Sequence, residues 1–124
     1  MNRQVTRVVL AVMGDGDAGL ATAFARVLRD AGAEVVFAGV LATVADVIAT
    51  AGQEDPRALA VTGAREEDVV ALAAEGVPLF VFGEPSPPVV PDGVAVVGPE
   101  WDEAAEAVLS ARFHTAEAPS DRAR

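Results

Sequence analysis

Short apolar runs alternate with longer amphipathic segments along most of the chain. The apolar runs are brief and rich in β-branched residues, which is typical of strands buried on both faces of a parallel sheet. The strands are expected at Thr6 to Val12, Glu34 to Ala38, Ala58 to Thr62, Pro78 to Phe82 and Val94 to Val97. The pattern therefore predicts a parallel sheet of five strands.

Amphipathic segments fill most of the gaps between these runs. In the first segment Phe24 and Leu28 recur at helical spacing on one face, and Gly32 follows as a stop signal. Thr43 is a favourable N-cap for the second segment, with Asp46 three residues later. The expected helices cover Asp17 to Ala31, Thr43 to Ala51 with Gly52 as its stop, Glu66 to Glu75, and Glu100 to Phe113.

A proline-rich segment interrupts the alternation after the fourth expected strand. Pro85, Pro87, Pro88 and Pro91 lie close together, and proline both lacks a backbone donor and clashes with the preceding helical turn. We expect a loop where a helix would otherwise connect strands four and five. The predicted fold class is α/β, a Rossmann-like or flavodoxin-like doubly wound parallel sheet that lacks this one helix.

The chain has 124 residues, which suits one domain. We expect residues 1–113 to form the α/β domain and residues 114–124 a disordered tail. No apolar run approaches the roughly 20 residues of a membrane span. The polar start Met1-Asn2-Arg3-Gln4 lacks the apolar region of a signal peptide. A cytoplasmic protein without a membrane partner is expected.

The composition excludes several kinds of chemistry. Without cysteine, the chain has no disulfide, thiolate zinc site or cysteine nucleophile. It also lacks lysine and tyrosine, so neither a Schiff base nor a phosphate-binding lysine is available. The net charge of −10 would repel a phosphate backbone, which disfavours a nucleic acid partner.

Ligands of doubly wound sheets bind beyond the carboxyl ends of the strands. The loops expected at that edge are rich in glycine, which permits close backbone approach, and they carry several carboxylates. The candidate binding residues in these loops are Asp15, Gly16, Asp17, Gly19, Thr62, Gly63, Ala64, Gly83, Glu84 and Gly98.

Two kinds of functional site known for this fold, a phosphorylated receiver site and a dinucleotide site, fit these loops poorly. A phosphorylated receiver domain needs an acidic residue after the third strand and a lysine after the fifth, where this chain has Thr62-Gly63 and Gly98-Pro99. The segment Gly14 to Gly19 does match the spacing Gly-x-Gly-x-x-Gly of dinucleotide sites. However, Asp15 and Asp17 inside that loop would repel a pyrophosphate.

The first sixty residues also form one longer pattern. A strand ends in Met13-Gly14, Asp15-Gly16 follows, and an alanine-rich helix contains Ala21-Thr22-Ala23-Phe24. Asp30-Ala31-Gly32-Ala33-Glu34-Val35 then leads into the second strand. This arrangement resembles the cobalamin-binding domain of methylmalonyl-CoA mutase and its relatives, over about residues 5–113. The resemblance implies cobalamin as a cofactor and a mutase large subunit as a partner.

The chain departs from the family at the residues that hold the cofactor. The family motif Asp-x-His-x-x-Gly supplies a cobalt-ligating histidine, oriented by the aspartate. Asp15-Gly16 can stand for its first two positions and Gly19 for its last, so only Asp17-Ala18 remain and the histidine has no counterpart. The sole histidine, His114, is expected about 20 Å away at the far end of the last helix.

Two further family positions also differ. A Ser-x-Leu segment after the third strand corresponds to Thr62-Gly63-Ala64, and a Gly-Gly pair after the fourth corresponds to Gly83-Glu84. The glutamate is bulky and charged. These departures call into question both cobalt ligation and the slot for the nucleotide tail of cobalamin.

Three functions are compatible with this sequence. The shortened loop and Glu84 favour a non-catalytic partner or regulatory subunit of a mutase-type system that has lost histidine-on cobalamin binding. A corrinoid carrier without a protein histidine ligand is the first alternative, and a strand-end cleft repurposed for another small ligand or reaction is the second. No catalytic residue or metal ligand is assigned, because helix capping accounts for Asp15 and Asp17 and core packing for Trp101. A homo-oligomer is compatible with each reading.

Overall fold

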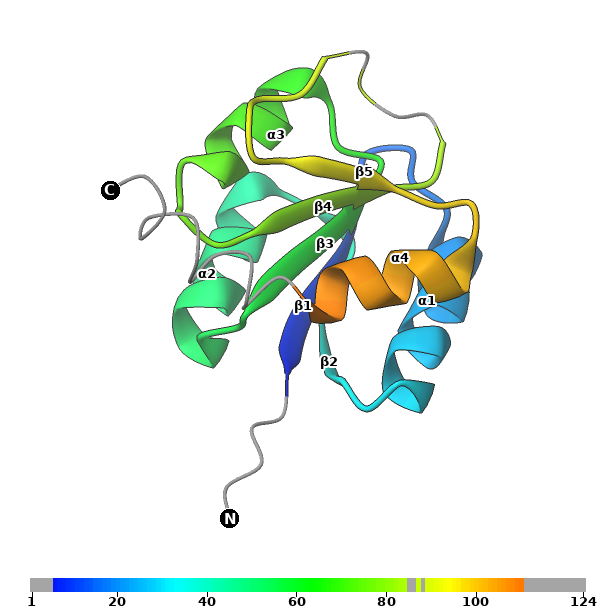
Figure 1. The fold of residues 1–124 in the computed structure, drawn as a ribbon. Helices are drawn as coiled ribbons and strands as arrows, with labels where there is room; N and C mark the ends of the chain where they lie inside the picture. The colour runs from blue at the N-terminus through cyan, green and yellow to red at the C-terminus, as the bar shows by residue number, and fades with distance from the viewer. Residues whose placement is uncertain (1–5, 85–86, 88, 111–124) are drawn as a thin grey trace, which may run out of the picture.

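The computed structural model describes residues 6–84, 87 and 89–110 (Figure 1). Strands and helices alternate as the sequence predicts. In chain order the elements are β1 (Arg7–Met13), α1 (Ala18–Asp30), β2 (Glu34–Ala42), α2 (Val44–Glu54), β3 (Ala58–Thr62), α3 (Glu66–Ala73), β4 (Leu79–Phe82), β5 (Ala95–Val97) and α4 (Trp101–Leu109).

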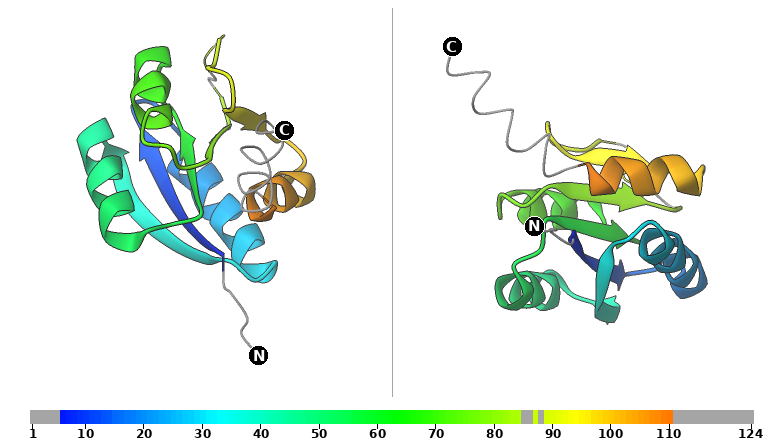
Figure 2. Two further views of the ribbon diagram at one scale, coloured as in Figure 1. Left: turned by 60° about the vertical axis from the view of Figure 1, so that its left-hand side comes forward. Right: turned by 60° about the horizontal axis from the view of Figure 1, so that its bottom comes forward.

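The strands form one five-stranded sheet in the order β2-β1-β3-β4-β5. Every neighbouring pair is parallel, and this strand order is the flavodoxin-like form of the doubly wound fold. Helices α1 and α4 cover one face of the sheet, and α2 and α3 cover the other (Figure 2). The predicted fold class is confirmed, and all five strand ends that precede a ligand loop lie at one edge.

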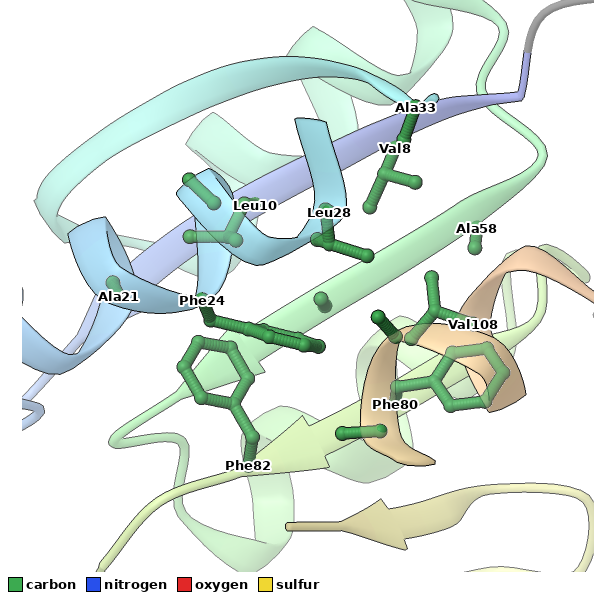
Figure 3. Close-up of a cluster of buried hydrophobic side chains, with 14 of the residues drawn as sticks. Val8, Leu10, Ala21, Phe24, Leu28, Ala33, Ala58, Phe80, Phe82 and Val108 are labelled. Carbon is green, nitrogen blue, oxygen red and sulfur yellow. The ribbon is translucent and has the colours of Figure 1, made fainter. Parts of the chain in front are cut away.

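Each face of the sheet has its own hydrophobic core. Val8 and Leu10 of β1 pack toward α1 and α4 with Phe24, Leu28 and their neighbours (Figure 3). Val9 and its alternate neighbours point the other way, toward α2 and α3. Because both faces are covered, β1 is almost continuously apolar rather than alternating, which is why a short apolar run predicted it correctly.

Two boundaries differ from the sequence prediction in the first half of the chain. Strand β2 continues four residues beyond Ala38, because Gly39 adopts a φ of +136° and the β1–β2 register shifts at two points. Helix α2 runs through Gly52 to Glu54. It ends where Asp55 takes a left-handed conformation with φ +49°, so the predicted glycine stop was wrong.

The later elements are close to their predicted positions. Helix α3 ends at Ala73, two residues before the predicted Glu75. Helix α4 spans Trp101–Leu109. The predicted end of that helix at Phe113 and the predicted tail from His114 lie outside the described residues.

The connection from β4 to β5 has no helix among its described residues, as the prolines predict. Val90 and Val94 of this connection pack against the core on the α2 and α3 side of the sheet. Val96 of β5 is nevertheless 53% exposed. The connecting segment therefore covers the last strand only in part.

Acid is expected to weaken the start of helix α2. The Thr43 backbone N–H donates to Asp46 Oδ2 at 2.9 Å, and the Asp46 N–H donates to Thr43 Oγ1 at 3.1 Å. Hydrogen bonds from the Thr43 backbone and then its side chain lower the pKa of Asp46 below the ordinary 3.8. The stabilisation is therefore complete above that value and is lost as pH falls through the lower folded-state pKa.

The variant Asp46→Asn tests this expectation, since asparagine can still accept the Thr43 hydrogen bond but does not titrate. Urea denaturation followed by circular dichroism, at pH values on both sides of 3.8, should show a shallower acid loss of stability in the variant than in the parent. Identical pH profiles for the two proteins would contradict the role given to Asp46.

Candidate functional site

The loops after β1 and β3 pack against each other backbone to backbone. A Cβ on Gly63 would overlap the Met13 carbonyl oxygen and the Gly16 nitrogen. A Cβ on Gly14 would lie 2.8 Å from the Gly63 carbonyl oxygen, and one on Gly16 would lie 2.8 Å from that of Thr62. Three of the glycines that flank the predicted site therefore serve the contact between the two loops.

The β1–α1 loop is a tight turn that leads directly into a capped helix. The Gly16 N–H donates to the Met13 carbonyl at 2.8 Å. Asp17 is the N-cap of α1, and its Oδ1 accepts the Leu20 N–H at 3.1 Å. The capping role predicted for Asp17 is confirmed, whereas Asp15 is exposed in the turn before it.

Thr62, at the end of β3, has no exposed surface, and its hydroxyl has no hydrogen-bond partner among the described residues. The hydroxyl lies beneath Gly83. A Cβ on Gly83 would be 2.6 Å from Thr62 Oγ1 and 2.6 Å from Leu20 Cδ2. These two side chains therefore fill the space beneath the β4 strand end.

A cavity of about 350 Å³ opens at the carboxyl ends of β4 and β5. The predicted site residues Asp17, Gly83, Glu84 and Gly98 all line it. Asp15, Gly16, Gly19, Thr62, Gly63 and Ala64 are not part of its lining. The structure thus divides the predicted residues into a cavity wall and a neighbouring pair of packed loops.

Five described residues of the cavity wall were not predicted as site residues, namely Leu20, Val96, Val97, Pro99 and Trp101. Leu20, in the first turn of α1, and Trp101, at the start of α4, both line the cavity. The indole of Trp101 also stacks on Phe24, with ring centroids 5.1 Å apart, and meets Phe82 edge-on at 6.3 Å. Trp101 is therefore both a core anchor, as predicted, and a cavity wall. Its position two residues after the Gly98-Pro99 strand end was the sequence signal for the second role.

The described residues contain neither a nucleophile beside a base nor a group of three or more histidine, cysteine or acidic side chains able to hold a metal ion. Asp17 and Glu84 both line the cavity, and the described part of its lining includes no basic residue. Within the described ranges, no helix is long and apolar enough to cross a membrane. The geometry is that of a small binding cavity with negative charge.

No protein-family model and no curated protein sequence matches this chain. Solved structures do match it. A cobalamin-binding protein from Desulfitobacterium hafniense DCB-2 has a TM-score of 0.68 at 19% sequence identity, over 86% of this chain and 58% of that one. The methanol:cobalamin methyltransferase complex MtaBC from Methanosarcina barkeri gives 0.66 at 18% identity, over 88% of this chain and 51% of its match.

The lysine decarboxylase LdcF from Francisella novicida gives a TM-score of 0.63 at 11% identity, over 91% of this chain and 18% of that one. The chain therefore has the fold found in cobalamin-binding proteins and also in a protein of a different activity. It spans little more than half the length of the first two structures that it matches.

Proposed function

We propose that this chain is a cobalamin-binding-domain-like protein that has lost histidine-on cobalamin binding. In this proposal it acts as a non-catalytic, cytoplasmic partner or regulatory subunit of a mutase-type system. The observation that carries the proposal is the state of the loop after β1, where the family resemblance places the cobalt ligand. That loop is a short, capped turn without a histidine.

The motif can also be aligned to this loop without a gap, and that alignment too leaves no histidine at the cobalt-ligand position. With Asp15 at the first position of Asp-x-His-x-x-Gly, the histidine position falls on Asp17 and the final glycine position on Leu20. Asp17 is engaged as the N-cap of α1. The Leu20 side chain reaches to within 2.6 Å of where a Gly83 Cβ would be. Both alignments leave cobalt without a histidine from this loop.

The space beside these loops also argues against the usual docking of the nucleotide tail. The resemblance puts that tail next to the loops after the third and fourth strands. There Thr62 and Leu20 fill the space beneath Gly83, and the backbone of Gly63 lies against Gly16. The cavity next to these residues, about 350 Å³, is at the lower end of the roughly 300–1,000 Å³ of small-molecule pockets. It suits a ligand much smaller than a corrinoid.

A partner role is supported by one structural neighbour. One matching structure is of a complex, the methanol:cobalamin methyltransferase MtaBC. The partner that we propose for this chain is a mutase large subunit or a methyltransferase.

A corrinoid titration tests the loss of the cofactor. After incubation with hydroxocobalamin or adenosylcobalamin, the purified protein is expected to elute from gel filtration without corrinoid absorbance. A cobalamin-binding protein with an intact Asp-x-His-x-x-Gly motif serves as the positive control. Co-elution of corrinoid with this chain would overturn the proposal and favour the carrier alternative, in which case its spectrum should lack histidine ligation.

Co-expression tests the partner role separately. The chain would be produced together with a mutase large subunit or, separately, with a corrinoid methyltransferase subunit, and each mixture separated by size-exclusion chromatography. A shared peak of defined stoichiometry is expected. Separate elution at every concentration tested would contradict the subunit assignment, whatever the outcome of the corrinoid titration.

A further inference from the structure

We infer that the cavity at the ends of β4 and β5 binds a small organic cation, specifically a primary amine carrying an aromatic or aliphatic body. This site goes beyond the partner role and does not require it. It gives a chemical class to the ligand of the strand-end cleft. The inference rests on the wall of the cavity, on its charge and on its size.

One side of the cavity is apolar and rigid. Leu20, Val97 and Trp101 contribute to its wall. Trp101 stacks on Phe24 at a centroid distance of 5.1 Å, and Phe24 is completely buried, so the indole is held in one orientation. An aromatic or aliphatic body can therefore bury its surface against a preformed wall, with little loss of side-chain entropy in the protein.

The polar groups of the cavity wall are acidic. Asp17 Oδ1 accepts the Leu20 N–H, and no other hydrogen bond to this carboxylate is found among the described residues. Glu84 has neither a hydrogen bond nor an ion pair within the same residues, and it is exposed at the rim. Two carboxylates with acceptor capacity to spare suit an ammonium group, which has three donors and no acceptor.

Two helices begin at this edge of the sheet, but their positive ends do not reverse the preference of the cavity for a cation. Helices α1 and α4 both begin beside the cavity, and each amino terminus carries the equivalent of about +0.5 charge. Asp17 caps α1, and Asp102 and Glu103 lie in the first turn of α4. An adjoining hollow across Gly98 is lined by Glu100 and Glu103. The full negative charges outweigh the two helix dipoles, so an anion would be repelled.

The relative size of these terms supports the same conclusion. An ammonium group in contact with a carboxylate interacts with a full opposite charge, whereas an anion at a helix start interacts only with the partial charge of the helix dipole.

Trp101 is the only tryptophan of the chain and lines the cavity, so its fluorescence reports on the site. Titration with phenethylamine is expected to produce a saturable change, with a matching heat in isothermal titration calorimetry. The acid 3-phenylpropionate, which has the same phenylethyl body, and the neutral isostere 2-phenylethanol are the comparison ligands. They should bind at least about tenfold more weakly, since a factor of ten corresponds to about 1.4 kcal/mol.

Two variants locate the site. Glu84→Gln and Asp17→Asn should each weaken amine binding about three- to tenfold, and binding should also weaken at high salt. Asparagine caps helices about as well as aspartate, so Asp17→Asn keeps the fold. The control Glu75→Gln removes the same charge from an exposed position that does not line the cavity, and should leave the affinity unchanged.

Equal binding of the acid and the amine would overturn the inference, as would the absence of any saturable fluorescence change and heat with phenethylamine. An equal loss of affinity in Glu75→Gln would show a general charge effect and would overturn it as well. These measurements use the isolated chain. A failure to bind the amine would therefore not contradict the proposed partner role. A failure to find a partner protein would likewise not contradict the proposed amine site.

Discussion

Replacing Gly63 by alanine is expected to destabilise the fold by about 2–5 kcal/mol, a large part of the roughly 5–15 kcal/mol available to a domain. Gly63 has a φ of +81°, and a Cβ there would overlap the Met13 carbonyl oxygen and lie 2.6 Å from Gly16 Cα. The left-handed conformation costs a non-glycine residue about 1–2 kcal/mol. Forcing an extra carbon into a packed contact adds about 1–3 kcal/mol.

Gly76 provides a matched control for that substitution. Its φ of +84° is close to that of Gly63, but a Cβ there would meet no atom within 4 Å. Gly76→Ala should therefore show only the conformational part, about 1–2 kcal/mol. Guanidinium denaturation of both variants measures the difference. Equal midpoints for the two would show that the loops after β1 and β3 can separate without cost.

Phe24→Ala is expected to produce a second large loss, about 3–5 kcal/mol. Phe24 is completely buried. Its ring lies 5.0 Å from that of Phe82 and 5.1 Å from the indole of Trp101. Removing the ring leaves a void where α1, α4 and β4 meet, and it takes away the stacking partner of Trp101.

Thermal unfolding with a parallel record of Trp101 fluorescence measures this effect. The melting temperature should fall, and the emission should shift toward that of a solvated indole because the stacking partner is gone. Val96→Ala is the control, since Val96 is 53% exposed and should change stability by less than about 0.5 kcal/mol. A loss below about 1 kcal/mol in Phe24→Ala would mean that the neighbouring side chains collapse into the void.

The predictions from the sequence were most successful where burial determined the pattern. Strands covered on both faces must be apolar throughout, so β1 and β3 were found almost to the residue. The end of β2 was missed: the strand was expected to end at Ala38, but Gly39 adopts a φ that lets pairing continue past a bulge. Likewise, Gly52 lies inside α2, and Asp55 forms the cap. A glycine in a sequence marks freedom of the backbone without showing how that freedom is used.

The cavity lies at the edge of the sheet where the ligand loops were predicted, and four of the ten candidate residues line it. The rule that ligand loops follow the strands located Asp17, Gly83, Glu84 and Gly98, which line one cavity. It could not show that Gly63 would be used to pack against the loop after β1, since that contact joins segments far apart in the chain. From the sequence, Leu20 and Trp101 were interpreted as core residues, because the helical periodicity does not show which part of a side chain remains accessible.

The contact between the loops after β1 and β3 also has an engineering consequence. Met13, Gly16 and Gly63 touch through backbone atoms, so neither loop can be lengthened or redirected without displacing the other. Grafting a histidine-bearing loop between β1 and α1 would therefore create a steric conflict with residues almost fifty positions downstream. A redesign that seeks to return cobalt ligation to this scaffold must exchange both segments together, as a single transplanted unit.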